Sequence, residues 1–399
     1  MRLLRNRAFL LVFTGMAISL LGDALFALAM PLWVLESTGS AGAVALLAGV
    51  RSAASLLLSP LAGTLADRND RRTVMIAADL ARAGATGLLA LYLLWGGSGL
   101  TPIVLIGFVL SVAGVFFAPA YAAAQSGLVH PDDLTQSLSL FQLMRQVVSF
   151  AGPALAGLVV ARTGAPAAVG LDALSFLVSA LCIAAVRLEW GVRPPKARRP
   201  FWHDLRSGIT TVAGHLVLRR TVLLTCGVNC AGAMFGVLLP VIGLREWNLS
   251  AGQYGLWSTV SPAGVMLGLA AVSVAAGRIR RRGRFMLWAL LAMGAVNLAM
   301  GWAGGFWPFT VLLFLGGLTF GLSNVMFAAI FRALVPQEQQ GRFFGLLGSI
   351  NQALQPLGLA LAGVMADRVS PFTGAALAGG AVVLLAVWGL LGPGLRDVV

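Results

Sequence analysis

Long apolar runs separated by short polar turns repeat along the whole chain. A run of about 20 apolar residues has the length of a helix that crosses a membrane. The pattern therefore predicts an all-α polytopic membrane protein with twelve transmembrane helices. The predicted spans are 8–35, 42–66, 74–95, 101–127, 136–160, 167–187, 220–243, 252–276, 285–303, 308–331, 342–366 and 371–391.

The longest polar stretch, residues 188–219, lies between the sixth and seventh spans. Prolines break its first part, and residues 201–216 then carry apolar side chains at helical spacing, which predicts an amphipathic helix on the inner membrane surface. This linker divides the chain into two halves of six helices each, residues 1–187 and residues 220–399.

The two halves repeat one another weakly, at offsets of about 206–210 residues. Tandem halves related by an axis along the membrane normal are a transporter architecture, with the substrate site between the halves at the membrane midplane. The matched pairs are "LFALAMPLWVLE" (25–36) with "MFGVLLPVIGLR" (234–245), "SAGAVALLAGV" (40–50) with "SAGQYGLWSTV" (250–260), and "RQVVSFAGPALAG" (145–157) with "NQALQPLGLALAG" (351–363).

The charges are few and unevenly distributed, at 11% of residues with a net charge of +14. With the N-terminus in the cytoplasm, 22 of the 28 Lys and Arg residues fall on the inner side. This asymmetry is the positive-inside rule, and it predicts that both termini are cytoplasmic. The basic excess is then a topology signal, and we expect no nucleic-acid partner. The apolar run that follows "MRLLRNR" is too long for a signal peptide and is interpreted as an uncleaved first helix.

The polar turn "GTLADRNDRR" (63–72) resembles the signature loop of the major facilitator superfamily, of pattern G-x-L-a-D-R-x-G-R-R. Gly63, Asp67 and Arg68 match, as do Arg71 and Arg72, while Asp70 stands where glycine is usual. The segment "FFAPAYAAAQSGLVHPDDL" and the stretch that begins "GPALAGLVVARTG" are similar to the branch that contains enterobactin exporters and macrolide efflux proteins.

The sequence "GPALAG" (152–157) resembles the helix-five motif of the exporters in this superfamily, through Gly152, Pro153 and Gly157. The resemblance implies a bacterial inner-membrane transporter that exports small amphiphilic molecules of the drug or siderophore type, driven by protons. We expect it to act as a monomer among membrane lipids. A facilitator, an importer or a lipid-handling transporter of the same fold is the alternative, and a non-transporting receptor is less favoured.

The loop 63–72 carries charge of both signs on the predicted inner side, beside the start of span eleven. A carboxylate near a helix N-terminus gains about 0.3–1 kcal/mol. We therefore expect Asp67 and the loop arginines to form a latch that stabilises the outward-facing state. In the alternative interpretation, the arginines only enforce topology.

Four charged residues that fall within predicted spans are candidates for ion coupling: Asp23, Arg51, Arg82 and Arg145. A charge at the centre of a bilayer costs about 2.5–3.5 kcal/mol on insertion scales, so each needs a partner or a function. Asp23 is the carboxylate nearest the midplane and is the candidate proton carrier. A permanent ion pair of Asp23 with Arg51 or Arg145 is an equally weighted alternative.

Two further acids lie in the same half of the chain. Asp79 is three residues before Arg82 on one helix, which predicts a local structural pair. Asp172 is placed near the outer end of span six. The corresponding positions of the second half carry no charge, which predicts a neutral, apolar wall for the substrate in that half.

Aromatic and amide side chains in the spans are candidates for lining the cavity, although contact with lipid or with other helices is an alternative for each. These candidates are Phe26, Tyr121, Phe141, Asn229, Trp257, Asn324, Phe327, Asn351 and Gln355. The sequence contains no nucleophile–base pair, phosphate-binding loop or cluster of metal ligands. We therefore expect a small-molecule substrate and protons as partners, and neither a cofactor, a metal nor enzymatic activity.

Overall fold

The structure is a computed structural model that describes residues 3–125, 127–186, 214–275, 281–392 and 394–397, with residues 210, 212 and 279. Of the side chains within these ranges, those of residues 4, 60, 63–68, 131, 338, 339, 341 and 342 lie outside the description. The predicted amphipathic helix at 201–216 falls mostly outside the described residues, so that helix and the boundaries of the two halves stay predictions.

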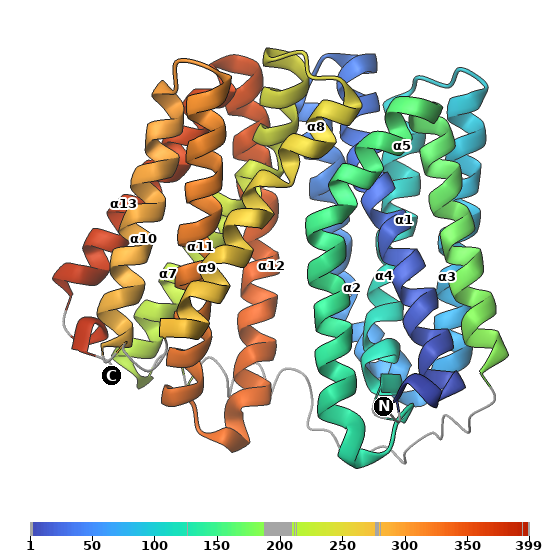
Figure 1. Cartoon of the computed structure of the whole chain (residues 1–399), viewed down its shortest axis with the longest axis horizontal. Helices are drawn as coiled ribbons and strands as arrows, with labels where there is room; N and C mark the ends of the chain where they lie inside the picture. The colour runs from blue at the N-terminus through green and yellow to red at the C-terminus, as the bar shows by residue number, and fades with distance from the viewer. Residues whose placement is uncertain are drawn as a thin grey trace. The chain divides into compact units, whose positions relative to one another are not determined.

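The described part of the chain is helical and contains no β-strand (Figure 1). Its first part comprises η1 (Leu3–Arg5), α1 (Arg7–Thr38), α2 (Ala41–Arg68), α3 (Arg71–Leu94), α4 (Leu100–Gln125), η2 (Pro131–Asp133) and α5 (Leu134–Ala185). Its second part comprises α7 (Leu216–Pro240), η3 (Val241–Glu246), α8 (Ala251–Ser258), α9 (Val260–Ala275), α10 (Arg282–Ala299), η5 (Met300–Trp302), α11 (Phe306–Leu334), α12 (Gln337–Arg368), α13 (Pro371–Leu391) and η6 (Leu395–Asp397).

The helix bounds lie within a few residues of the predicted spans, and α13 coincides with the predicted span 371–391. The main difference is α5. It contains predicted span five (136–160) and nearly all of predicted span six (167–187), with no loop between them. Gly164 adopts φ 78° and ψ 165° inside α5, so the chain turns there and both limbs stay helical (Figure 1). A left-handed φ of this kind is open to glycine at little cost.

Ten of the described helices are long and apolar enough to span a membrane, and the 52 residues of α5 form one of them. Helix α12 is not among the ten, because the amides Asn351, Gln352 and Gln355 lower its hydropathy. The chain is an all-α multi-pass membrane protein, and the number of twelve spans stays a prediction.

Local sequence explains where several helices begin and end. The Asn6 side chain caps α1 by accepting hydrogen bonds from the backbone N–H of Ala8 (3.0 Å) and Phe9 (3.1 Å). Helix α1 ends at Gly39, which adopts φ 67°. Ser370 caps α13, and Pro371 follows at a position where its missing N–H costs nothing.

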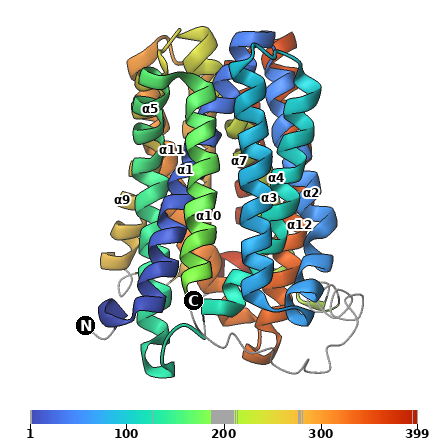
Figure 2. The same cartoon turned by 90° about the vertical axis from the view of Figure 1, so that its right-hand side faces the viewer.

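The contacts divide the chain into two compact units, and each is described by itself (Figures 1 and 2). Unit 1 holds residues 1–39, 50–198 and 249–256, so it includes α1, α3, α4, α5 and most of α8. Unit 2 holds residues 40–49, 199–248 and 257–399. The first turns of α2 therefore belong to unit 2, whereas the rest of this helix belongs to unit 1.

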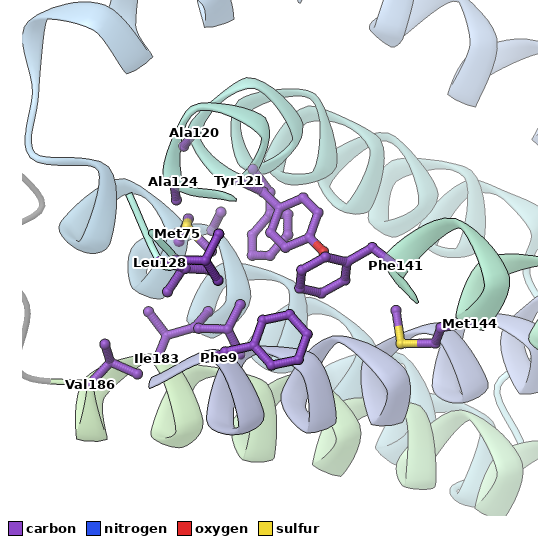
Figure 3. Close-up of a cluster of buried hydrophobic side chains, with 14 of the residues drawn as sticks. Phe9, Met75, Ala120, Tyr121, Ala124, Leu128, Phe141, Met144, Ile183 and Val186 are labelled. Atoms are coloured by element: carbon purple, nitrogen blue, oxygen red, sulfur yellow. The ribbon is translucent and has the colours of Figure 1, made fainter. Parts of the chain in front are cut away.

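An aromatic and aliphatic cluster fills one end of unit 1 (Figure 3). Phe141 on α5 makes edge contacts with Phe9 of α1 and Tyr121 of α4, at ring-centroid distances of 5.5 and 5.6 Å. Met75 of α3 and Ile183 of α5 complete the cluster. It joins the ends of four helices and so fixes the helices that carry the charged residues described below.

Glycines set the closest helix contacts in unit 2. A Cβ added at Gly264 or Gly268 of α9 would strike backbone atoms of α11, which presents Gly317 and Gly321 at the same contact. Small residues let transmembrane backbones approach in this way. Gly264 and Gly268 thus permit the close approach of α9 to α11.

Candidate functional site

A buried ion pair lies at the centre of unit 1. Arg82 and Asp79 of α3 form the predicted pair three residues apart, and their side chains are 9% and 0% exposed. The Arg82 guanidinium also lies over the rings of Phe117 (4.4 Å) and Phe176 (4.6 Å). Arginine is suited to this role because its planar cation stacks on aromatic faces while it donates to a carboxylate.

Two more carboxylates surround this pair. Asp172 of α5 is 1% exposed and packs against Gly22 of α1, where an added Cβ would lie 2.5 Å from Asp172 Oδ1. Ser175 donates a hydrogen bond to the backbone carbonyl of Asp172 (2.7 Å). Asp23, the residue after Gly22, is half-buried and interacts electrostatically with Arg82, Arg51, Asp79 and Asp172.

The structure contains neither of the permanent ion pairs considered for Asp23. Among the described residues, Asp23 forms no ion pair with Arg51 or Arg145. Arg51 instead lies over the ring of Phe26 at 5.2 Å, and Arg145 lies over the ring of Tyr121 at 5.7 Å. Asp23 is therefore a partly exposed carboxylate beside a buried charge cluster, without a fixed cationic partner.

Asp172 is the member of this cluster that sequence reasoning did not select. Its position near the start of span six suggested a place close to the membrane surface. The packing of α5 on α1 instead brings it level with Gly22, near the middle of the 32-residue helix α1. The available signal was a lone acid in an apolar run, but its partners depend on contacts between helices far apart in sequence.

Most of the segment 63–72 is helical, because α2 continues through Arg68 and α3 begins at Arg71, so a tight turn at residues 69 and 70 joins the two helices. The side chains of Gly63, Asp67 and Arg68 lie outside the description, so their part in a latch stays a prediction.

Asp70, which stands where the family usually has glycine, is the N-cap of α3. Its carboxylate accepts hydrogen bonds from the Thr73 backbone N–H (3.0 Å) and hydroxyl (2.7 Å). Burial acts to raise the pKa of Asp70, but these hydrogen bonds and the nearby Arg72 outweigh it and hold the pKa below its ordinary value. Asp70, in place of the usual glycine, thus provides the N-cap of α3.

Arg71 and Arg72 contact helix ends in the same unit. Arg71 donates to the carbonyl of Ala123 at 3.0 Å, near the end of α4, and Arg72 donates to the carbonyl of Ala184, near the end of α5. Cations are favourable at helix C-termini, where carbonyl groups lack partners within the helix. Both arginines therefore hold the ends of α4 and α5, and among the described side chains neither forms an ion pair with Asp70.

The residues of the helix-five motif lie at close contacts between helices. A Cβ added at Gly152 would lie 3.0 Å from Ala24 Cβ of α1. One added at Gly157 would lie 2.6 Å from the Ala251 carbonyl oxygen and 2.7 Å from Gly255 Cα of α8. The Pro153 carbonyl lies beside the same Gly255. Glycine is therefore required at position 157 for the approach of α5 to α8.

Four of the nine candidate cavity residues line one pocket in unit 2. Asn229 of α7, Asn324 and Phe327 of α11, and Asn351 of α12 surround a space of about 260 Å³. None of the described residues that line it is charged. The structure thus places a neutral pocket in unit 2 and the charge cluster in unit 1.

The other candidate cavity residues do not line this pocket. Tyr121 and Phe141 belong to the buried cluster of Figure 3, and Phe26 lies under Arg51. Trp257 donates a hydrogen bond from Nε1 to Thr310 Oγ1 (2.9 Å) and packs among aromatic rings of unit 2. Gln355 is exposed on α12, one turn beyond Asn351.

The comparison with family profiles agrees with this architecture. The profile described as Major Facilitator Superfamily matches residues 12–245 and 221–396, which together cover most of the chain. The chain belongs to the Major Facilitator Superfamily. For the described residues of this facilitator, no group of three or more His, Cys, Asp or Glu side chains is placed to hold a metal ion.

Two characterised facilitators match the chain over nearly their whole length. Macrolide efflux protein A of Streptococcus pyogenes is 24% identical over 387 residues, which are 95% of this chain and 94% of that protein. The enterobactin exporter EntS of Shigella flexneri is 28% identical over 392 residues, which are 96% of this chain and 91% of EntS. The resemblance to this branch of the facilitators is confirmed.

A solved structure shows the same fold. A bacterial homologue of the iron transporter ferroportin superposes with a TM-score of 0.76 at 16% sequence identity, covering 98% of this chain and 100% of that one. At this level of identity, the likeness supports the facilitator fold alone.

Proposed function

We propose that this facilitator is a secondary transporter of a bacterial inner membrane that exports small amphiphilic molecules by alternating access, driven by protons. Two similar proteins carry the names of a macrolide efflux protein and an enterobactin exporter, which supports export. The observation that carries proton coupling is the half-buried Asp23 beside buried Asp79, Asp172 and Arg82. Both termini would be cytoplasmic, and the protein would act as a monomer in contact with lipid.

The charge balance of the cluster supports this coupling. Asp23, Asp79 and Asp172 face the two guanidinium groups of Arg82 and Arg51, so the ionised set carries one excess negative charge. Uncompensated charge is costly in a low-dielectric interior, and one bound proton would remove it. Asp23 is the partly exposed acid of the three, so it is the group through which that proton would enter and leave.

The alternating cycle then needs two states that differ in their access to Asp23. Protonation of Asp23 removes its attraction to Arg82 and Arg51, which changes the relative free energy of the two states. The loop 63–72 would stabilise the state closed on the inner side, with Asp67 near the start of α12. Arg71 and Arg72 would support that loop through the ends of α4 and α5.

Proton-coupled export can be tested in inside-out vesicles that contain this chain and have an acidic lumen. A macrolide, a catecholate siderophore, a lipophilic cation and a lysophospholipid are added in turn while the internal pH is recorded. We expect at least one compound to discharge the gradient with the wild type and not with Asp23→Asn. The matched control is Asp132→Asn, since the Asp132 side chain is 83% exposed next to His130.

The same vesicles separate the alternatives. If labelled compounds enter the lumen without any pH change, then the chain is an uncoupled facilitator or a lipid-type transporter. If accumulation occurs only in vesicles of the opposite orientation, then it is an importer. Full concentrative transport by Asp23→Asn would disprove the role of Asp23.

A further inference from the structure

The size and lining of the pocket in unit 2 indicate what kind of chemical group it can hold. Its volume of about 260 Å³ is below the roughly 300–1,000 Å³ typical of sites for drug-sized ligands. It therefore suits one moiety of a larger molecule. Phe320, Phe327, Phe331 and Phe344 supply aromatic walls around it.

Several polar groups of the pocket already donate hydrogen bonds within their own helices. The Thr225 and Ser323 hydroxyls donate to backbone carbonyls of their own helices, at 2.8 and 2.9 Å. The Asn229 side-chain nitrogen also donates to a carbonyl, that of Thr225, at 2.8 Å. The two hydroxyl protons and one N–H of Asn229 are thus engaged, and the oxygen atoms of these side chains remain as acceptors. The amides of Asn229, Asn324 and Asn351 also carry N–H donors.

Asn351 carries a buried acceptor in this pocket. Its Oδ1 is buried and has no hydrogen-bond partner among the described residues. A buried acceptor without a partner is destabilising, and a ligand removes that cost when it donates to the atom. No charged side chain is among the described residues that line the pocket, so a cationic group placed there would lose its hydration without gaining a counter-charge from them.

We propose that this pocket binds an uncharged, hydroxyl-bearing aromatic or aliphatic moiety of the exported molecule, and that Asn351 accepts a hydrogen bond from that hydroxyl. This inference rests on the proposed export function and names the substrate chemistry of its site. Asn351 is then a specificity-determining residue, and Asn229 supports it from α7.

The test uses three benzophenone photoprobes with the purified full chain in lipid nanodiscs: 4-(3-hydroxypropyl)benzophenone, its methyl ether and its trimethylammonium analogue. Light-induced labelling of α11 and α12 is quantified by mass spectrometry. We expect the hydroxyl probe to label these helices about five- to tenfold more than the ether, since one net hydrogen bond is worth roughly 1 kcal/mol.

Asn351→Leu should reduce labelling by the hydroxyl probe to the level of the ether. Asn297→Leu is the matched control, because this amide lies on α10 and does not line the pocket. Equal labelling by hydroxyl and ether probes, strongest labelling by the ammonium probe, or no labelling of α11 and α12 by any probe would each overturn the proposal. Labelling needs no proton gradient, so failure of the vesicle assay with intact labelling would reject the export mechanism alone.

A second, independent observation concerns Asp367, near the end of α12. Its carboxylate accepts hydrogen bonds from the backbone N–H groups of Ala41 and Gly42 and from the Ser40 hydroxyl, each at 2.8 Å. Arg245 also donates to Asp367 at 3.2 Å. The Asp367 carboxylate on α12 therefore caps the N-terminus of a different helix, α2, at residues that are 325 and 326 positions away in the sequence.

Sequence relates this contact to the loop 63–72. The segment "AGVMADR" (362–368) ends α12 and repeats "AGTLADR" (62–68), which ends α2. Asp67 is expected to cap the start of α12 on the inner side. Asp367 is observed to cap the start of α2, which the predicted topology places on the outer side.

The first turns of α2 also fit closely against α12. A Cβ added at Gly363 would lie 2.8 Å from Ala45 Cβ and 3.1 Å from Gly42 Cα. These turns belong to unit 2, and the continuous helix carries on into unit 1. Movement of unit 1 with the whole of α2 therefore requires these contacts to break.

We infer that Asp367 is an outer latch, reciprocal to the loop 63–72, which must release α2 once in each transport cycle. To test this, Val44→Cys places a thiol at a buried position (3% exposed) in the first turns of α2, after Cys182, Cys226 and Cys230 are changed to Ser. The rate of modification by a membrane-impermeant maleimide is measured in right-side-out vesicles. We expect Asp367→Asn to raise that rate at least fivefold.

Ser40→Ala removes one of the three hydrogen bonds from this segment to Asp367, together with the bond that Ser40 Oγ accepts from the Ala43 N–H (3.3 Å), and should raise the modification rate less than Asp367→Asn. Glu246→Gln is the control, since Glu246 pairs with Arg245 at 3.2 Å and makes no hydrogen bond to α2 among the described contacts. Unchanged modification in both Asp367→Asn and Ser40→Ala would show that Asp367 is not a latch. A loss of fold in Asp367→Asn would leave Ser40→Ala to decide the question.

Discussion

At the scale of single residues, the Asp79–Arg82 pair is the most constrained feature of unit 1. Removing one partner of a buried ion pair leaves an unpaired charge and costs about 3–5 kcal/mol, whereas an apolar replacement of both is often neutral. Two aromatic rings already face the Arg82 guanidinium, so an apolar side chain in its place would find contacts.

The first prediction is that Asp79→Leu lowers the melting temperature, because it removes the carboxylate that pairs with buried Arg82 and leaves only the more distant Asp23 and Asp172 to balance its charge. The double variant Asp79→Leu with Arg82→Met should recover most of that loss. Thermal unfolding followed by size-exclusion chromatography with fluorescence detection measures both. A double variant less stable than Asp79→Leu alone would contradict the pair's structural role.

Sequence predicted this pair because its two residues lie one turn apart on one helix. It also selected Asp23, since an acid at mid-span is rare. It did not place Asp172 with them, because that contact depends on Gly22 and on how α5 folds back at Gly164. Spacing along a helix is visible in sequence, whereas contacts between helices depend on packing.

At the scale of helices, glycines decide which elements can touch. Gly→Ala within a helix normally favours the helix by about 1 kcal/mol. At Gly157 that gain is opposed by backbone atoms of α8, with the Ala251 carbonyl oxygen 2.6 Å from an added Cβ. At Gly114 on α4 nothing lies within 4 Å of an added Cβ.

The second prediction is that Gly157→Ala slows transport and lowers the melting temperature, while Gly114→Ala leaves both unchanged or raises stability slightly. Initial rates in vesicles and thermal unfolding provide the measurements. Equal behaviour of the two variants would show that the approach of α5 to α8 is not limiting.

The third prediction concerns pH at the Asp367 cap. Burial acts to raise the pKa of Asp367, but hydrogen bonds from Gly42, Ala41, Ser40 and Arg245 outweigh it and hold the pKa below its ordinary value. A group with a lowered pKa stabilises the folded contact above its unfolded pKa of about 3.9 and loses that contribution as the pH falls through the lowered value. Modification of the Val44→Cys thiol should therefore be independent of protonation of Asp367 between pH 5 and 8. The rates are corrected for thiol ionisation with a free-thiol standard, and a corrected rate that rises between pH 7 and 5 would contradict this cap.

Helix positions were predictable because apolar runs of membrane length are hard to mistake, and caps such as Asn6 and Gly39 follow known preferences. Two features of the elements were not. The turn inside α5 depends on one glycine with a positive φ, and α8 is separated from α9 at Thr259 within one predicted span. Hydropathy averages over such single-residue changes of direction.

At the scale of the whole molecule, the two halves repeat weakly in sequence but differ in the polar groups that they bury. The charge cluster belongs to unit 1, while the amide-lined pocket belongs to unit 2. Sequence predicted this division, because the positions of the second half that match the charged residues are uncharged. It could not show that three asparagines would share one pocket, since they come from α7, α11 and α12.

The last prediction follows from that division: variants of the two units should fail in different ways. Asp23→Asn should abolish discharge of the proton gradient while labelling by the hydroxyl photoprobe stays within about twofold, because residues without shared partners contribute additively. Asn351→Leu should lose the preference for the hydroxyl probe and still discharge the gradient at saturating substrate. Photolabelling and vesicle pH measured on the same two preparations test both statements. Loss of probe binding in Asp23→Asn would mean that the substrate contacts the charge cluster directly, so that coupling works through competition for Asp23 and not through a change of conformation.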